Sequence, residues 1–453
     1  MPFINENFLL ENKVAKDLYA RAAEGCPIVD FHNHLPVRDL CEDRKYPDIG
    51  TLWVCSDPYK HRAMRLMGLD ERLISGAASP KEKFDAWCRT VPALVGNPLF
   101  HWSCLEMKRF FGIDEIPSEA GADRLWAHCN NLLKEDGFSM GALLRKTGVR
   151  KATTSDDLLD DTSLHREASQ VSGIEISPSL RADSILALNP SWQERLSPEE
   201  DSLDAFLEAV SLRLDTFAGN GCRLSDHALD NGFVFKATSR ERASWLFRKR
   251  DRMDRSEKAE LFSYLLEWLG RQYAVRGWVM QLHIGAERWT STRLRRIAGA
   301  TGGYACPGSG TDLSSLCRFL DAMDRDGGMP KVILYTLNPA DNAALATLTG
   351  SFSESGVQKI KFGPAWWFND HFYGIEENLE VISSYSLLSQ SLGMTTDSRN
   401  VLSFSRHEYF RRILCNWLGT KVARGHFPKD PDLLEDLVKD ICYQNANRWI
   451  YGE

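Results

Sequence analysis

Pro27-Ile28-Val29-Asp30-Phe31-His32-Asn33-His34, close to the start of a chain of 453 residues, brings two histidines to the end of a short apolar run. The apolar, β-branched residues before the histidines predict a buried strand. Because side chains on a strand alternate between two faces, His32 and His34 point the same way. An imidazole pair at this spacing can hold one metal ion, although two structural histidines at a strand end would look the same. The rest of the chain has to decide between these interpretations.

The composition is that of a globular protein with a sizeable core, since 43% of the residues are hydrophobic and 26% are charged. The net charge of −7 and the pI near 5.9 argue against a nucleic-acid-binding surface. The 11 cysteines are an odd number without a Cys-x-x-Cys spacing, which favours reduced thiols over disulfides or a thiolate zinc site. With neither a signal peptide nor a run of about 18 apolar residues, the sequence predicts a cytoplasmic protein that does not span a membrane.

The order of the apolar runs predicts a barrel. Eight short strands are expected, most of them separated by helical segments, at residues 28–32, 149–154, 174–180, 221–225, 278–283, 331–337, 357–362 and 392–396. Alternation of strands and helices implies parallel strands, and eight such units predict an α/β fold built on a (β/α)8 barrel of the TIM type. An open doubly wound sheet is the alternative, and the lack of a Gly-x-Gly-x-x-Gly after the first strand counts against it.

A long helical pattern interrupts the barrel after its first strand. Helices are predicted at residues 62–67, 82–90, 102–111 and 124–133, with no convincing strand before residue 148. Such a segment is too long for a bare loop, so we expect a single barrel domain over residues 1–453 that contains a helical insertion at 38–146. A helical C-terminal segment, at residues 406–418 and 432–445, completes the predicted fold.

Polar side chains follow the predicted strands at the end where barrel enzymes carry their chemistry. The set comprises His32, His34, Arg181, Asp226, His227, His283, Asp397 and Arg399. Asp397 is the best third ligand, because a carboxylate opposite two imidazoles leaves open positions on a metal. The mouth of the predicted barrel is basic, because it gathers Arg181, Arg399 and His283. Since arginine holds carboxylates by a bidentate fork, we expect an acidic substrate. The alternative for Arg399 is an internal salt bridge.

The order of His-x-His on the first strand and Asp on the eighth resembles the amidohydrolase superfamily. Within it the chain resembles the uronate isomerase (glucuronate isomerase) family over almost its whole length. The matching stretches include Asp30-Phe31-His32-Asn33-His34-Leu35-Pro36, Gly221-Cys222-Arg223-Leu224-Ser225-Asp226-His227, Gln281-Leu282-His283-Ile284-Gly285-Ala286 and Thr396-Asp397-Ser398-Arg399, with others at 59–65, 82–87, 96–102, 365–370 and 406–412.

This resemblance implies an aldose–ketose isomerisation. D-glucuronate, and D-galacturonate likewise, would become the 2-ketohexuronates D-fructuronate and D-tagaturonate through an enediolate. One divalent metal ion, expected to be zinc, would sit on His32, His34 and Asp397, although manganese or iron suits the same ligands. The catalytic roles would fall on Asp397, Tyr59, Arg399 and His283, with Asp397 or a water on the metal as the base and Tyr59 as the proton carrier. The substrate-binding roles would fall on Arg181, Asp226, His227, Arg399 and Trp366.

Three loops depart from the family pattern and leave the preferred uronate open. Pro58 precedes Tyr59 where the family usually has histidine, Glu287-Arg288-Trp289 replaces the usual loop after His283, and Leu158 stands where a proline is usual. The metal and core positions match, so these departures bear on the substrate more than on the reaction class.

Two other functions compete with the isomerase. One is a mononuclear metal-dependent hydrolase of the same superfamily, acting on a small carboxylated substrate. A two-metal centre is disfavoured, because the strand-four lysine and the strand-six histidine of such hydrolases are missing. The other is a non-catalytic barrel that binds sugar acids. The expected partner is a small hexuronate, with no nucleic acid and no membrane, and whether the chain forms a homo-oligomer stays open.

Overall fold

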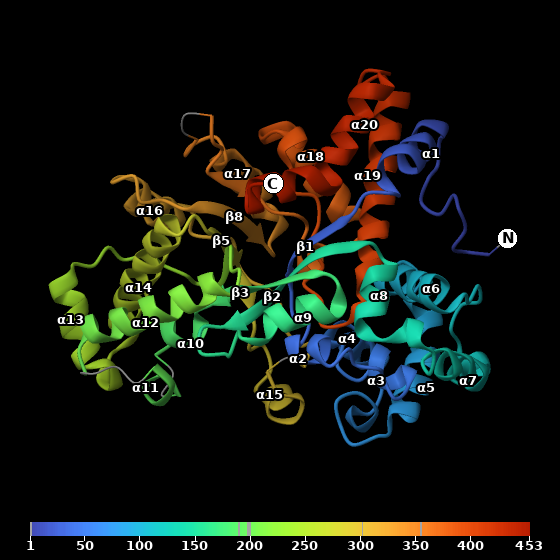
Figure 1. Ribbon diagram of the computed structural model, residues 1–453, viewed down its shortest axis with the longest axis horizontal. Helices are drawn as coiled ribbons and strands as arrows, with labels where there is room; N and C mark the ends of the chain where they lie inside the picture. The colour runs from blue at the N-terminus through green and yellow to red at the C-terminus, as the bar shows by residue number, and fades with distance from the viewer. Residues whose placement is uncertain (1, 189–190, 197–200, 301, 354–355) are drawn as a thin grey trace.

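The centre of the molecule is a curled parallel sheet (Figure 1). The computed structural model describes residues 2–188, 191–196, 201–300, 302–353 and 356–453. Within these residues seven strands are neighbours in the order β1-β2-β3-β4-β5-β8-β9. Their bounds are β1 Ile28–Asn33, β2 Val149–Asp157, β3 Glu175–Arg181, β4 Leu224–Leu229, β5 Val279–Ile284, β8 Lys331–Thr336 and β9 Ile360–Phe362. The prediction of an α/β fold with a distorted barrel is therefore confirmed, and all seven strands match predicted ones.

The predicted eighth strand, at residues 392–396, is wrong. This segment has no strand conformation, yet its end lies beside β1. The amide of Asp397 donates to the carbonyl oxygen of His32 at 2.9 Å, and the amide of His34 donates to the carbonyl oxygen of Ser398 at 2.8 Å. Asp397 has a φ of +49°, which bends the chain out of the extended conformation that a ladder requires. The apolar pattern thus predicted the position of residues 392–396, the segment that closes the barrel beside β1, but wrongly predicted that this closing segment is a strand.

Side chains replace the missing ladder between this segment and β1. The hydroxyl of Thr395 bridges the backbone of His32, accepting from its amide and donating to its carbonyl oxygen, each at 2.8 Å. The carboxylate of Asp30 accepts the amide of Thr396 at 2.9 Å and the imidazole N–H of His407 at 2.9 Å. Asp30 is fully buried, so these bonds satisfy carboxyl oxygens that water cannot reach.

Two smaller differences concern the boundaries of the strands. β4 was predicted at residues 221–225 but extends to Leu229, so Asp226 and His227 lie within it instead of following it. A short antiparallel pair, β6 Ala286–Glu287 with β7 Cys306–Pro307, follows β5 and was not predicted. Two-residue strands leave no period in a sequence that could reveal them.

Helices fill the chain between β1 and β2. They are α2 Val37–Cys41, α3 Ile49–Trp53, α4 Pro58–Leu66, α5 Pro80–Thr90, α6 Pro98–Phe111, α7 Ala122–Leu132 and α8 Met140–Lys146. Figure 1 shows them gathered on one side of the sheet. Their starts carry clear signals: Pro58, Pro80 and Pro98 occupy first turns, and Ser79 with Glu82 forms a capping box on α5. The four helices predicted in this region are all present.

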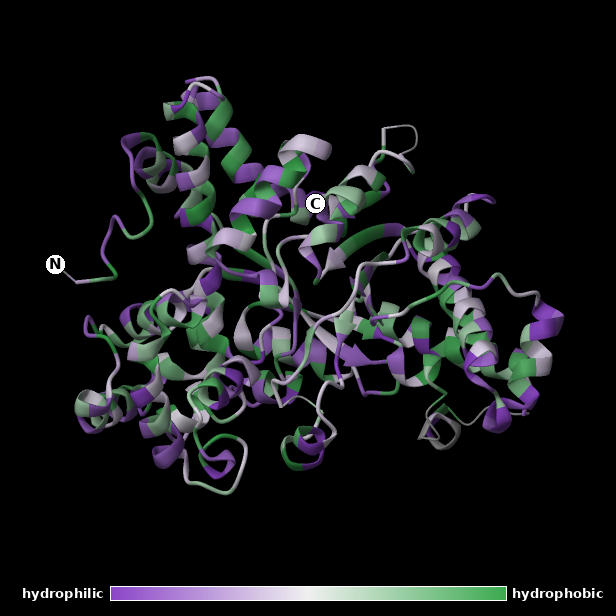
Figure 2. Ribbon diagram, turned by 180° about the vertical axis from the view of Figure 1, so that it is seen from behind, coloured by the Kyte–Doolittle hydropathy of each residue, from purple (hydrophilic) through white to green (hydrophobic). Residues whose placement is uncertain are grey.

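The remaining helices connect the strands or follow them. They are α1 Lys13–Leu18, α9 Leu164–Ser172, α10 Asp183–Leu186, α11 Ser191–Leu196, α12 Leu203–Gly219, α13 Arg240–Arg248, α14 Arg255–Val275, α15 Thr292–Ala298, α16 Leu313–Asp324, α17 Asn342–Leu348, α18 Phe372–Tyr385, α19 Arg406–Ala423 and α20 Pro431–Lys439. Hydrophobic residues concentrate in the sheet and on the inward helix faces (Figure 2). In the part of the chain that the structure describes, no helix is long and apolar enough to cross a membrane.

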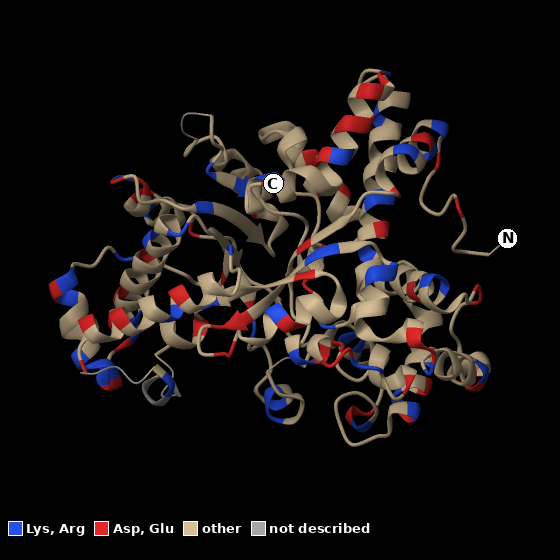
Figure 3. Ribbon diagram, in the orientation of Figure 1, with Lys and Arg blue, Asp and Glu red and all other residues tan. Residues whose placement is uncertain are grey.

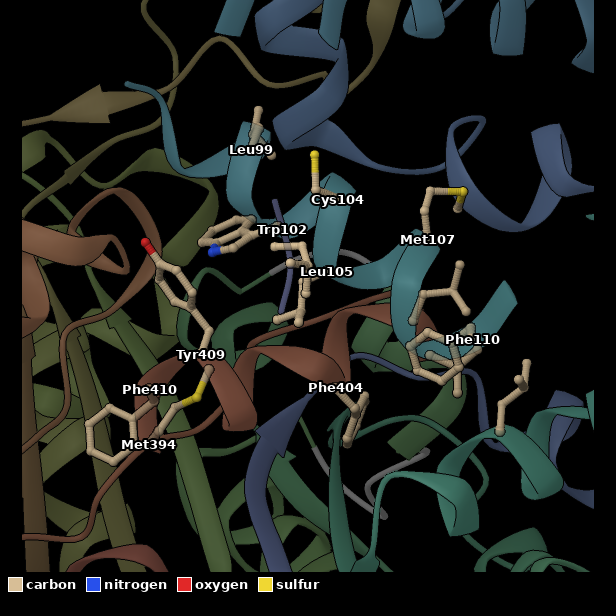
Figure 4. Close-up of a cluster of buried hydrophobic side chains, with 14 of the residues drawn as sticks. Leu99, Trp102, Cys104, Leu105, Met107, Phe110, Met394, Phe404, Tyr409 and Phe410 are labelled. Atoms are coloured by element: carbon tan, nitrogen blue, oxygen red, sulfur yellow. The ribbon is translucent and has the colours of Figure 1, made fainter. Parts of the chain in front are cut away.

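One hydrophobic cluster joins the first helices, the helices after β1 and the C-terminal helices. Figure 4 shows its centre, where α6 with Trp102 and Leu105 faces α19 with Tyr409 and Phe410. Phe404, just before α19, is fully buried in the same cluster. Burying this apolar surface fixes the helices after β1 against the barrel wall, and with them the residues that α4 presents to the site.

Candidate active site

A cavity of about 760 Å³ opens at the carboxyl ends of the strands. Predicted site residues that line it are His32, His34, Tyr59, Arg181, His283, Trp366, Asp397 and Arg399. They come from the sheet, from the loops that follow it and from α4, so segments far apart in the sequence meet in one place. Two predicted residues, Asp226 and His227, do not line it.

The donor atoms of His32, His34 and Asp397 form a cluster that could hold a metal ion. These atoms lie within 4.8 Å of one another. One carboxylate oxygen of Asp397, Oδ1, lies 3.3 Å from Nε2 of His32 and 3.0 Å from Nε2 of His34. Two imidazole nitrogens and one carboxylate oxygen are a donor set that divalent transition metals accept.

A second group of donors adjoins the first, made of His32, Asp226 and His283. The rings of His32 and His283 lie 4.6 Å apart. Both Nδ1 of His32 and Nε2 of His283 are buried without a hydrogen-bond partner. Buried polar atoms normally have a partner, so these orphaned nitrogens fit a site built to receive a further group.

The charges of the site suit a cation. Although burial opposes ionisation, hydrogen bonds from His32 and His34 hold the pKa of Asp397 well below its ordinary value. Burial lowers the pKa of His34 to about 4 and, together with the charge of His32, holds the pKa of His283 well below its ordinary value. Asp397 is thus a carboxylate, and His34 and His283 are neutral imidazoles that keep a lone pair for a ligand. Although burial opposes it, Asp397 and Asp226 raise the pKa of His32, so a metal ion bound there would displace the proton of His32.

The orientation of Asp397 is set by its surroundings. Its other carboxylate oxygen, Oδ2, accepts a hydrogen bond from the indole Nε1 of Trp366 at 3.1 Å. Its φ of +49° is uncommon for a residue other than glycine, and such conformations persist where neighbouring contacts enforce them. Trp366 is buried and also packs on the ring of His283 at 4.6 Å, so it forms a wall of the cavity.

Asp226 lies behind Arg181 and supports it. Its carboxylate accepts hydrogen bonds from Ser155 Oγ at 2.9 Å, Ser179 Oγ at 2.7 Å and Arg181 Nη1 at 3.3 Å. Although burial opposes it, the charges of His32 and Arg181 hold its pKa below the ordinary value. Arg181 also donates to Asp183 at 2.7 Å, so its guanidinium is anchored on two sides where it meets the cavity.

Arg399 lines the cavity from the loop after the closing segment. Within the described residues no carboxylate oxygen lies within the 4.0 Å that would define a salt bridge to its guanidinium. The internal salt bridge considered as an alternative is therefore not seen, and Arg399 is available to an acidic ligand.

His227 does not fit the predicted role in substrate binding. It is fully buried on the outer face of β4, where its ring stacks on Tyr273 of α14 at 5.6 Å and 21°. The prediction assumed that β4 ended at Ser225. Because the strand continues, neighbouring side chains alternate, and Asp226 turns inward while His227 turns toward the helices.

Tyr59 reaches the cavity from the first turn of α4. Asp57 caps this helix by accepting the amides of Tyr59 at 2.9 Å and Lys60 at 3.2 Å. The phenol oxygen of Tyr59 is buried without a partner, and its ring packs edge-on against Trp102 at 5.9 Å. Burial, reinforced by the charge of Asp397, raises the pKa of Tyr59, so the phenol keeps its proton.

The structure adds a rim that the sequence did not predict. Arg62 lies over the ring of Phe368 at 5.2 Å, and Arg288 lies over the ring of Trp367 at 5.6 Å. Arg288 also donates to Asp230 at 2.8 Å. Arg62 stands one helical turn after Tyr59, a spacing that could have revealed it, whereas the loop positions of Trp367 and Phe368 carry no such signal.

Comparison with known proteins agrees with this geometry. A family model described as glucuronate isomerase matches residues 1–450. A uronate isomerase of Geobacillus thermodenitrificans is 40% identical over 99% of this chain and 99% of its own length. One from Salmonella arizonae is 41% identical over 99% and 98%. The crystal structure of a uronate isomerase from Thermotoga maritima matches with a TM-score of 0.92 and 31% identity, covering 99% of this chain and all of that one.

Proposed function

The chain belongs to the glucuronate isomerase family, and from this premise we infer that it is an aldose–ketose isomerase of hexuronates. It interconverts an aldohexuronate such as D-glucuronate with the corresponding 2-ketohexuronate. One observation carries the site assignment: a metal-competent cluster, two arginines and a protonated tyrosine line the same cavity.

We propose that His32, His34 and Asp397 hold one divalent cation, zinc being the ion that best suits two imidazoles and a carboxylate. When bound, such an ion polarises oxygen atoms of the sugar and so eases loss of the neighbouring carbon-bound proton. His283 supplies a neutral ring beside this cluster, where it can hydrogen-bond a sugar hydroxyl.

Arg181 and Arg399 are proposed to bind the carboxylate of the uronate. Each guanidinium offers a planar fork of N–H donors that matches a carboxylate. Arg181 is held by Asp183 and Asp226, so it need not reorganise when the substrate arrives. This binding fixes the acid end of the sugar and leaves the aldehyde end to the metal-competent cluster.

The isomerisation requires a proton to leave C2 and a proton to arrive at C1. Asp397, ionised and oriented by Trp366, is proposed as the group that accepts the C2 proton and then returns a proton to C1, which restores the carboxylate. Tyr59, which keeps its proton, is proposed to carry a proton to and from the sugar oxygens as the enediolate forms and collapses. Trp366 shields this exchange from water along one wall of the cavity.

Proton NMR in D2O tests the reaction. The purified, metal-loaded protein is incubated with D-glucuronate and with D-galacturonate. We expect loss of the C2 proton signal and the appearance of ketose signals for at least one of them. D-glucose serves as the control, because it lacks the carboxylate and should not turn over. Absence of both exchange and ketose with every uronate would overturn the proposal, and wild-type turnover in metal-loaded Asp397→Asn would overturn the role given to Asp397.

We also propose that the protein works in the cytoplasm. All eleven cysteines are free thiols in the structure, which suits a reducing compartment.

A further inference from the structure

A second cavity, of about 750 Å³, lies at the amino-terminal end of β8 and β9. Lys331 is the first residue of β8 and Lys361 is in β9, while Arg448 and Trp449 come from the last helical turn, Asn447–Tyr451. The active-site cavity lies at the opposite ends of the strands, and the two cavities have no lining residue in common. We call this second space the lysine cavity.

Among the described residues, the charged side chains that line the lysine cavity are those of three cations, Lys331, Lys361 and Arg448. The ammonium of Lys361 donates only to amide oxygens, those of Gln358 at 2.6 Å and Gln390 at 3.3 Å. The ammonium of Lys331 donates to the carbonyl oxygen of Trp449 at 2.6 Å. These acceptors are neutral, so they solvate the two ammonium groups without cancelling their charge.

Within the described residues neither ammonium has a carboxylate within 4.0 Å, whereas Arg448 meets Asp440 at 3.5 Å. Two other buried lysines do meet a carboxylate. Lys60 lies 2.6 Å from Asp57, and Lys151, at the start of β2, lies 2.7 Å from Glu453. Lys361 differs from these two, and among the described residues it shares the lack of a carboxylate partner with the buried Lys83.

The unpaired charges carry a cost. Lys361 is only 3% exposed, and a buried cation without a counter-charge destabilises the folded state. Burial, with the charge of Lys331 added, lowers the pKa of Lys361 to about 8, so the ammonium form is disfavoured but still predominates near neutral pH. An anion in the cavity would remove this cost.

The side chains that line the lysine cavity indicate which class of anion it would bind. Both ammonium groups adjoin the ring of Trp449, since Nζ of Lys331 lies 5.3 Å and Nζ of Lys361 lies 5.6 Å from its centroid. Lysine binds phosphate as a compact point charge with three donors. Gln390 also lines the cavity, and its amide nitrogen, which makes no hydrogen bond among the described residues, can donate to a further oxygen. Figure 3 shows basic residues on β8 and close to the C-terminus, where the cavity lies.

We propose that the lysine cavity binds a compact dianionic oxyanion of the phosphate class, either free phosphate or the phosphate group of a small metabolite. Lys331 and Lys361 supply the charge that recognises it. This site is separate from the isomerase centre and does not depend on the function assigned there.

Isothermal titration of the full-length protein with sodium phosphate and with D-glucose 6-phosphate, at constant ionic strength in chloride, tests the proposal. We expect saturable binding of one anion per chain. Loss of a charge-assisted hydrogen bond should weaken binding by about tenfold or more in Lys361→Gln and in Lys331→Gln. Lys359→Gln is the matched control: it removes a neighbouring lysine that does not line the cavity, and it should change the affinity by less than about twofold.

The two ligands identify the source of the anion. Tighter binding of sodium phosphate indicates free phosphate, and tighter binding of the sugar phosphate indicates a metabolite. Thermal melts of Lys361→Gln and Lys331→Gln show that each variant is folded, and unchanged isomerase activity shows that the site is separate. No saturable binding to the wild type, or binding that Lys361→Gln leaves unchanged, would overturn the proposal. Equal loss in Lys359→Gln would also overturn it, because the effect would then be general electrostatics.

Discussion

Asp397 contacts both histidines of β1 through one carboxylate oxygen and the indole of Trp366 through the other. At the scale of single residues, this arrangement makes it both a metal ligand and an oriented base in the proposed site. We therefore predict that His32→Ala and Asp397→Asn lower the bound metal to well under one equivalent per chain, because each variant removes one of three donors. Elemental analysis of the purified proteins measures this directly.

His227→Phe is the control for metal content. It changes a histidine of β4 outside the cavity and keeps the aromatic packing against Tyr273. It should bind as much metal as the wild type. If His32→Ala and Asp397→Asn also keep their metal, then the proposed ligand set is wrong.

Tyr59 is predicted to act in proton transfer and not in binding. Tyr59→Phe removes a phenol oxygen that has no hydrogen-bond partner among the described residues, so the cavity should keep its shape. We expect kcat to fall by about 10²- to 10⁴-fold, the range for loss of a general acid, with little change in KM and with full metal content. Steady-state kinetics on the preferred uronate would show it.

Tyr409→Phe tests whether any buried tyrosine gives that result. Tyr409 lies in the hydrophobic cluster behind the site, where its hydroxyl meets the ring of His101 at 3.1 Å. Its loss should affect stability more than kcat. A Tyr59→Phe enzyme with wild-type kcat would exclude Tyr59 as the proton carrier.

The residues that the sequence placed well are those whose position follows from strand alternation. His32, His34 and His283 face the cavity because each stands at the carboxyl end of a strand with an unmistakable apolar run. The predicted role of His227 was wrong because the end of β4 was placed a few residues too early. A shift of one residue along a strand moves a side chain to the opposite face of the sheet. Arg62 could have been inferred from its helical spacing to Tyr59, whereas Arg288 was missed because its place depends on how the loop after β5 packs, which no local pattern records.

At the scale of elements, the segment between β9 and β1 lacks the ladder that joins the other strands. Asp30 holds it by accepting the amide of Thr396, and the same carboxylate also accepts from His407 of α19 and from the side-chain amide of Asn33. Asp30→Ala should lower the free energy of unfolding by about 3 kcal/mol, because several buried donors lose their acceptor at once. It should also weaken metal binding, since the same contacts position Asp397. Urea unfolding and metal titration measure the two effects.

Thr395→Val is compared with Asp30→Ala, because it removes fewer of the hydrogen bonds that hold the closing segment. It removes the hydroxyl that bridges the backbone of His32 but preserves most of the side-chain volume. We expect a loss of about 1 kcal/mol, smaller than that of Asp30→Ala. Equal stability of the wild type and Asp30→Ala would show that the closing segment is held by packing alone.

The same segment explains why seven strands were predicted correctly and the eighth was not. Residues 392–396 carry the apolar pattern of a strand because they are buried, but burial does not require ladder hydrogen bonds. Instead, the Asp30 carboxylate of β1 accepts the amide of Thr396, and the Thr395 hydroxyl accepts the amide of His32, so these partners lie more than 360 residues apart in the sequence. A local pattern cannot distinguish the two solutions.

At the scale of the whole molecule, we propose that residues 1–453 fold as one barrel domain with residues 38–146 as an insertion. One hydrophobic cluster combines residues of the first helices, of α3 to α8 and of α19 and α20. Removing the insertion would expose that shared surface. Its packing, and not a separate core, fixes α4 and therefore Tyr59 relative to the sheet.

The free energy of unfolding should depend on pH because of the buried ammonium of Lys361. A lysine whose pKa is lowered on folding binds its proton more weakly in the folded than in the unfolded chain. Folding is then penalised below the folded-state pKa of about 8, and the penalty disappears as the pH rises toward 10.5, the ordinary value. Lys361→Met should therefore raise the free energy of unfolding near neutral pH by roughly 1 to 3 kcal/mol, and the gain should shrink with rising pH.

Urea unfolding in phosphate-free buffers between neutral pH and the onset of alkaline denaturation measures this difference. Lys359→Met is the control, since its side chain lies outside the cavity and its effect should not vary with pH in the same way. Adding phosphate should reverse the order, because the anion stabilises only the protein that retains both ammonium groups. A Lys361→Met protein less stable than the wild type at neutral pH, by the same amount at every pH, would mean that the bonds to Gln358 and Gln390 outweigh the buried charge.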